Sequence, residues 1–456
     1  MEDRVGPLEV LPPEIKNGII TKLSDVRSVF NLALTGPVFY KHIFQDDNGS
    51  NERRIAAAIV VAQVGTTLLP IAIARYEASI ISWKRVSSPQ TSSTPVLASM
   101  LCERIIQFSN ERLINRHVTE LPMRLASLLI ANDIISCHEA IQHFSAILSI
   151  KAAENMPSHP YGMTDHERES VIPNNREKTR FSKALYIFEL ISELFMVNKD
   201  NTVVWDAQQA TVLALATFWQ RFAPWENQQV NCTQHLLAEH IRNEIIHGTW
   251  HCPSFAPEIL WEFVISQGAT GLYNIHSKGR HFVPFDVNSV HLCWGRHIIL
   301  GLPLPVGDDA IWYTSDTLWL KTAGRTVESH QLYNFDIAHL LREFPEEDSG
   351  PADIWFHSLV QNIPHPQVAA TWLVFKERDD LLRCNRCLTH WGFPFWDRKR
   401  LDEYSLGQFP TMEAMGNAMK DGSDNHVSVR ALVIHCACRP NVLRICRCYR
   451  PQGALS

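Results

Sequence analysis

The sequence predicts a mainly α-helical protein, in which three short N-terminal helices precede a larger helical body. Apolar residues recur at the spacing of amphipathic helices, between polar breaks rich in Pro and Ser. With 456 residues, 45% of them hydrophobic, the chain is long enough to bury a substantial core. No convincing repeat occurs at a period of about 20 to 50 residues, so leucine-rich and propeller repeats are not expected.

The first expected helix begins at Pro12 and Pro13, because a proline in a first turn loses no needed N–H and has its φ already set. Apolar residues recur every four positions through this segment and therefore share one helical face. They are Leu11, Ile15, Ile19 and Leu23.

A second short helix is expected after Ser24, which can cap it, while Asp25 adds negative charge to the first turn. Its apolar residues follow i, i+3, i+4, i+7 spacing and are Val26, Val29, Phe30 and Ala33. Gly36, in a left-handed conformation, and Pro37 should end this helix, and Pro37 should open a third. Three short helices cannot bury all these side chains alone, so some are expected to face a partner.

Further helical patterns follow, between loops expected at 86–95, 156–178 and 344–353. They cover residues 51–64, 67–83, 96–115, 121–153, 180–198, 207–222, 236–246 and 257–266. The uncharged stretch 55–74 has the length of a membrane span. Polar residues, a glycine and Pro70 interrupt its centre, so two buried helices are expected here and no membrane partner.

The ordered combination of Leu-Pro-Pro-Glu-Ile at 11–15 and the apolar residues after it resembles an F-box. The resemblance implies that residues 6–50 dock on a Skp1-like adaptor and, through it, on a cullin-based ubiquitin ligase. The docking surface and its immediate support are expected to comprise Leu11, Pro12, Glu14, Ile15, Ile19, Leu23, Val29, Leu32, Leu34 and Tyr40.

Three later segments look like parts of a large class of fungal F-box proteins, namely 180–195, 222–230 and 395–401. The apolar stripe in the first fits a buried helix, whereas Trp225 and Trp396 fit either the core or the corners of an interface. By this resemblance, residues 51–410 form a non-repeat helical body that binds an unknown protein cargo. Holding cargo near a ubiquitin-conjugating enzyme raises its effective concentration and requires no catalytic residue from this chain.

Basic residues and cysteines near the C-terminus allow several interpretations of this part of the chain. Residues 398–400, Arg-Lys-Arg, fit a solvated helix face, and 411–456 fit a Cys- and Arg-containing tail with little ordered structure. The tail also has the composition of a palmitoylated anchor or a nucleic-acid arm. A structural zinc site is the further alternative, because Cys-x-x-Cys is half of a tetrahedral thiolate site. Its ligands would be Cys384, Cys387, Cys436 and Cys438.

Composition and motifs narrow the function class. The net charge of −6, from 42 basic and 48 acidic residues, gives no nucleic-acid footprint over the whole surface. Eleven cysteines and an N-terminus unlike a secretory signal favour reduced thiols in cytoplasm or nucleus. No hydrolase, metalloprotease or nucleotide-binding motif occurs, so no enzyme hypothesis has a candidate residue. The F-box resemblance implies a non-catalytic adaptor. The alternative is a helical scaffold or regulatory protein that takes no part in ubiquitin transfer.

Overall fold

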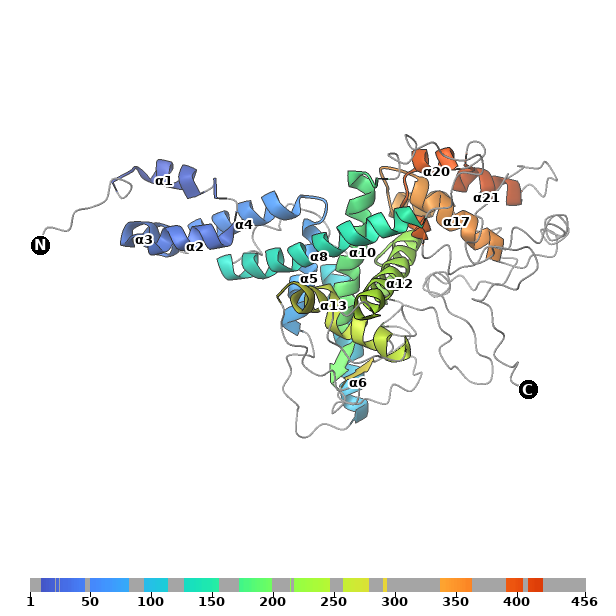
Figure 1. Cartoon of the computed structure of the whole chain (residues 1–456), viewed down its shortest axis with the longest axis horizontal. Helices are drawn as coiled ribbons and strands as arrows, with labels where there is room; N and C mark the ends of the chain where they lie inside the picture. Colours follow the sequence, from blue (N-terminus) through green and yellow to red (C-terminus); the bar gives the residue numbers. More distant parts are fainter. Residues whose placement is uncertain are drawn as a thin grey trace, which may run out of the picture.

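The computed structural model describes residues 10–20, 22–23, 25–45, 50–81, 94–113, 127–155, 172–198, 214, 217–246, 257–278, 290–292, 337–362, 391–404 and 409–420. Its elements are α1 (Pro13–Ile20), α2 (Val26–Leu34), α3 (Pro37–Phe44), α4 (Ser50–Val64), α5 (Leu69–Ile81), α6 (Thr94–Arg112), α8 (Leu128–Glu154), α10 (Asn175–Leu194), β1 (Met196–Asn198), α12 (Pro224–Ile246), α13 (Pro257–Lys278), β2 (Val290–Leu292), α16 (Ile337–Glu343), α17 (Gly350–Asn362), the 3₁₀ turn η7 (Phe393–Phe395), α20 (Arg398–Tyr404) and α21 (Met412–Lys420). The mainly helical fold predicted from the sequence is confirmed. Figure 1 shows α1–α3 projecting from one end of the molecule, with α17, α20 and α21 at the other.

The N-terminal module, α1–α3, has a small interior of its own. Its fully buried apolar side chains are Ile20, Val26, Val29, Ala33, Phe39 and Ile43. The N-cap of α2 is Asp25 rather than Ser24, because an Asp25 carboxylate oxygen accepts the Ser28 backbone N–H at 2.7 Å. This bond lowers the pKa of Asp25. Gly36 is extended (φ −176°) rather than left-handed, and Pro37 opens α3 as predicted.

The helices α4 and α5 link this module to the body. They are the two helices expected on either side of the break in the stretch 55–74, and both are largely buried. Within the described part of the chain, no single helix is long and apolar enough to cross a membrane. Taken together, α4 and α5 do meet that length and composition, but they bend by 117° between them.

The central helix of the body is α10, which packs against α5, α8, α12 and α13. Its apolar stripe is buried, as predicted, and consists of Phe181, Ala184, Leu185, Phe188, Ile191 and Phe195. The helix begins inside the loop expected at 156–178 because Asn174 and Glu177 form a capping box. It ends before residue 198, where β1 pairs antiparallel with β2 and Val197 lies opposite His291.

A second, smaller apolar core lies at the C-terminal end of the molecule, where α17 packs against α12, η7, α20 and α21. Its members are Ala223, Trp225, Ile337, Leu340, Ala352, Trp355, Phe356, Met412 and Met415. Residues 412–420, which the sequence placed in the tail, form α21 and contribute to this core. Trp225 and Trp396 are both fully buried, so they belong to the core rather than to interface corners.

Candidate protein-docking surface

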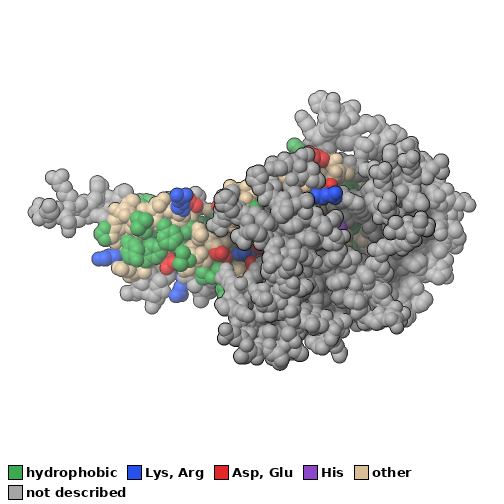
Figure 2. Space-filling view, turned by 60° about the horizontal axis from the view of Figure 1, so that its bottom comes forward, with side chains coloured by type: hydrophobic (Ala, Val, Ile, Leu, Met, Phe, Trp, Pro, Cys, Tyr) green, Lys and Arg blue, Asp and Glu red, His purple; other side chains and the backbone are tan. Residues whose placement is uncertain are grey.

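The α2–α3 hairpin has an apolar surface on its outer side as well as an apolar interior. Leu34 in α2 is 80% exposed and Tyr40 in α3 is 45% exposed, although both are large hydrophobic residues. Phe30 lies one turn before Leu34, and Phe44 one turn after Tyr40, so each pair shares a helical face. We call these four residues the hairpin patch; Figure 2 shows hydrophobic side chains gathered on the N-terminal helices.

Aromatic contacts join the two halves of the hairpin patch. The ring centroids of Phe30 and Phe44 lie 5.8 Å apart in a stacked arrangement, and those of Tyr40 and Phe44 lie 5.1 Å apart. These separations are typical of favourable aromatic pairs. The patch is therefore one connected surface that spans both helices. Exposed apolar side chains gathered in this way make the hairpin a candidate protein-interaction site.

The structure divides the ten predicted docking residues by exposure. Leu11, Ile19, Leu23 and Leu32 are half-buried, and Val29 is completely buried. The exposed members are Pro12, Glu14, Ile15, Leu34 and Tyr40. Val29 thus supports the surface from inside, and Leu34 and Tyr40 form part of it.

Phe30 and Phe44 belong to the hairpin patch but are absent from the predicted set. Both are half-buried and pack against the core while contacting the exposed side of the hairpin. The spacing of four residues from Phe30 to Leu34, and from Tyr40 to Phe44, was the sequence signal that could have identified them.

Hydrogen bonds fix the N-terminal module to the body. The Asn51 side-chain amide at the start of α4 donates to the His42 carbonyl in α3 at 3.0 Å. One residue later, a Glu52 carboxylate oxygen accepts the Leu128 backbone N–H at 2.9 Å, at the first turn of α8. Contacts between α2 and α8, and between α4 and α8, add to this junction. The hairpin patch is therefore held in a defined position relative to the body.

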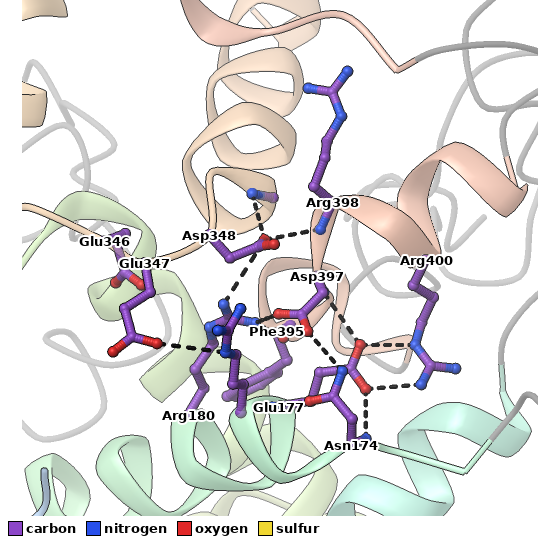
Figure 3. Close-up of polar contacts among 12 residues, drawn as sticks. Asn174, Glu177, Arg180, Glu346, Glu347, Asp348, Phe395, Asp397, Arg398 and Arg400 are labelled. Atoms are coloured by element: carbon purple, nitrogen blue, oxygen red, sulfur yellow. Dashed lines mark hydrogen bonds and ion pairs between the residues drawn. The ribbon is translucent and has the colours of Figure 1, made fainter.

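Figure 3 shows a polar cluster at the opposite end of the molecule, centred on Glu177 of α10. The Glu177 side chain is fully buried and receives two bonds from the Arg400 guanidinium, each 2.8 Å long. It also accepts the backbone N–H groups of Asn174 at 2.9 Å and Asp397 at 3.2 Å. The expectation of a solvated face at 398–400 is wrong for Arg400, because its guanidinium is needed to neutralise this buried carboxylate.

Arg180, one turn further along α10, makes a second connection to the same segment. Its guanidinium donates to Asp397 at 2.6 Å and to the Phe395 carbonyl at 2.9 Å, while Asp397 also accepts the Asn174 amide at 2.6 Å. The Phe181 and Phe395 rings stack with centroids 3.6 Å apart. The segments 180–195 and 395–401 are thus joined directly.

Arg398 connects this cluster to α17. Its guanidinium donates to Asp353 at 2.7 Å, and its backbone N–H donates to Asp348 at 2.8 Å. Burial raises the pKa of Asp353, although hydrogen bonds from the Met412 backbone and from Arg398 oppose that rise. A Cβ atom on Gly350 would lie 2.5 Å from both the Trp396 carbonyl oxygen and the Arg398 nitrogen. The buried charges in Figure 3 are paired with one another and join segments that are distant in the sequence; they belong to Glu177, Arg180, Asp397 and Arg400. The Arg176–Glu347 pair at the edge of this cluster is exposed.

A second buried charge group lies where α5, α8 and α10 meet. The Arg75 guanidinium lies 3.1 Å from Asp133, 3.5 Å from Glu189 and 3.7 Å from Glu193. Burial raises the pKa of the nearby Cys137 thiol to about 12, so this thiol stays protonated near neutral pH. The group therefore presents no thiolate nucleophile, and its ion pairs join three helices.

Among the described residues, no group of three or more His, Cys, Asp or Glu side chains could hold a metal ion. The four cysteines considered as zinc ligands, at 384, 387, 436 and 438, lie outside the described residues. No protein-family model, no curated protein and no solved structure matches the chain.

Proposed function

We propose that this chain is a substrate-recruiting F-box subunit of a cullin-based ubiquitin ligase. In this proposal α1–α3 dock on a Skp1-like adaptor, the helical body presents a protein cargo, and the protein acts in cytoplasm or nucleus. The observation that carries the proposal is the hairpin patch, where Leu34 and Tyr40 expose large apolar side chains on the segment that resembles an F-box.

The free energy of burying exposed apolar side chains favours a docking role for this surface. Burying an exposed leucine or aromatic side chain against a partner contributes about 1.5–3 kcal/mol. Leu34 and Tyr40, with the half-buried Phe30 and Phe44 beside them, would form the centre of an interface, where aromatic anchors are enriched. The attachment through Asn51 and Glu52 suits delivery, because a module fixed to the body holds cargo at a set distance from the ligase.

Co-expression of the full chain with a Skp1-like adaptor, followed by gel filtration, tests the proposal. Wild type is expected to co-elute with the adaptor, and the double substitution Leu34→Asp, Tyr40→Asp is expected to abolish co-elution. Circular dichroism should show an unchanged fold, since both side chains are exposed. The matched control is Ile150→Asp, which places the same charge on a 51% exposed apolar residue of α8 and should leave co-elution intact.

If the double variant still co-elutes with the adaptor, the hairpin patch is not part of the interface. A folded wild type that never co-elutes would overturn the ligase proposal and leave the alternative of a helical scaffold or regulatory protein. Co-purification of a cullin with wild type, but not with the double variant, would extend the result from docking to ligase assembly.

A further inference from the structure

The charged side chains of α2 and α3 are basic, although the whole chain is acidic. The full sequence has a net charge of −6. By contrast, α2 and α3 contain Arg27, Lys41 and His42 but neither Asp nor Glu. Arg27 and Lys41 are both exposed. The apolar surface at the tip of the molecule therefore has basic residues beside it, within an acidic protein.

Helical geometry places these basic groups at the edge of the patch. Arg27 lies seven residues before Leu34, two turns away on the same face of α2. Lys41 follows Tyr40 directly in α3. The two cations therefore flank the patch, one on each helix.

Among the described carboxylates of the module, only Asp25 acts on this edge, because its pKa is lowered by hydrogen bonds from Ser28 and also by the charge of Arg27. Asp25 is turned toward Ser28, from which it accepts both the backbone N–H and the side-chain hydroxyl at 2.7 Å. The other acid, Glu14, lies in the first turn of α1 and outside the hairpin. The described part of the module, residues 10–45, has four Lys and Arg residues and only these two acids.

We infer that the hairpin patch binds an acidic protein surface, with an apolar centre edged by Asp and Glu carboxylates. The inference rests on the proposed function and specifies the chemistry of the partner at that site. Leu34, Tyr40 and the two phenylalanines would fill the apolar centre, and Arg27 and Lys41 would face the carboxylates. Charges at the rim of an interface act mainly on the association rate and its salt dependence, whereas the buried apolar centre sets the dissociation rate.

The probe is a purified Skp1-like adaptor. Stopped-flow fluorescence monitors its association with the full chain at about 50, 150 and 500 mM NaCl, because the Debye length shortens as the salt concentration rises. Wild-type association is expected to slow at least about fivefold across this range. The double substitution Arg27→Glu, Lys41→Glu should slow association about tenfold or more at low salt. It should also reverse the salt dependence, because Glu repels the facing carboxylates and added salt screens that repulsion. Its dissociation rate should change by less than about threefold.

Three matched variants make the outcome specific. Arg27→Lys with Lys41→Arg preserves the charge and should associate at the wild-type rate. Lys399→Glu changes charge in the same sense at the opposite end of the molecule, where its side chain is 89% exposed, and should have no effect. Leu34→Ala should raise the dissociation rate about tenfold with little change in association.

Salt-independent wild-type association, or equal slowing by Lys399→Glu, would overturn the inference while leaving the docking proposal intact. The same holds if the charge reversal acts on dissociation alone. Wild type that does not bind the adaptor at any salt concentration would instead overturn the proposed function, and the inference with it.

Discussion

The buried ion pair between Glu177 and Arg400 gives the sharpest test of how the body is held together. The two side chains belong to helices far apart in the sequence, α10 and α20, and are 0% and 8% exposed. We consider three variants: Glu177→Leu, Arg400→Leu and the double substitution. Each single variant leaves one buried charge without its partner, whereas the double variant removes both charges.

The expected magnitudes follow from this burial. Removing one member of a buried ion pair costs about 3–5 kcal/mol of unfolding free energy, mostly because the remaining charge is stranded. In the double variant only neutral groups lose partners, chiefly the Asn174 and Asp397 backbone N–H groups that Glu177 accepts, at about 1–3 kcal/mol each. The double variant should therefore be about as stable as either single variant, which corresponds to a coupling energy of about 3–5 kcal/mol.

Urea denaturation at neutral pH, monitored by circular dichroism and tryptophan fluorescence, measures the unfolding free energy of each variant. The fluorescence comes from the 13 tryptophans of the chain, among them Trp396, whose ring centroid lies 5.1 Å from the Arg400 guanidinium. Lys399→Ala, at the exposed neighbour that pairs with Glu403 at 3.8 Å, should change stability by less than about 0.5 kcal/mol. Additive losses in the double variant, within about 0.5 kcal/mol, would refute the reasoning, because independent sites add.

Two further predictions concern packing and pH. Gly350→Ala should lower the unfolding free energy by about 1–3 kcal/mol, since its Cβ meets two backbone atoms at 2.5 Å. The control Gly18→Ala, with nothing within 4 Å of its Cβ, should be neutral or stabilising by up to about 1 kcal/mol, and Gly350→Ala without loss would contradict this packing. Burial, and to a smaller extent the neighbouring His276, lowers the pKa of His143 below its ordinary 6.5, so the unfolded chain binds more protons as pH falls. The contribution of His143 to stability is present above pH 6.5 and is lost as pH falls through the folded pKa. The substitution His143→Phe should therefore make the unfolding free energy less dependent on pH between about pH 7.5 and 5.5. An unchanged slope of unfolding free energy against pH would exclude this contribution.

The sequence alone determined the helical character and most helix positions, because the spacing of apolar residues reports directly on the buried face of a helix. The stripe from Phe181 to Phe195 is buried as that spacing predicts, and Pro37 begins α3 because proline fits a first turn. The sequence also predicted that part of the N-terminal module faces outward, since three short helices hold too little interior.

Tertiary structure decided the features that depend on residues far apart in the chain. Arg400 looked like a solvated charge because nothing near it in sequence shows that Glu177, more than two hundred residues earlier, lies beside it. The β1–β2 pair likewise needs strands from distant segments. The contact between the Phe30 and Phe44 rings forms only once α2 folds against α3. Local spacing fixes which face of each helix is apolar, but only packing decides which apolar face is covered and which charge is buried.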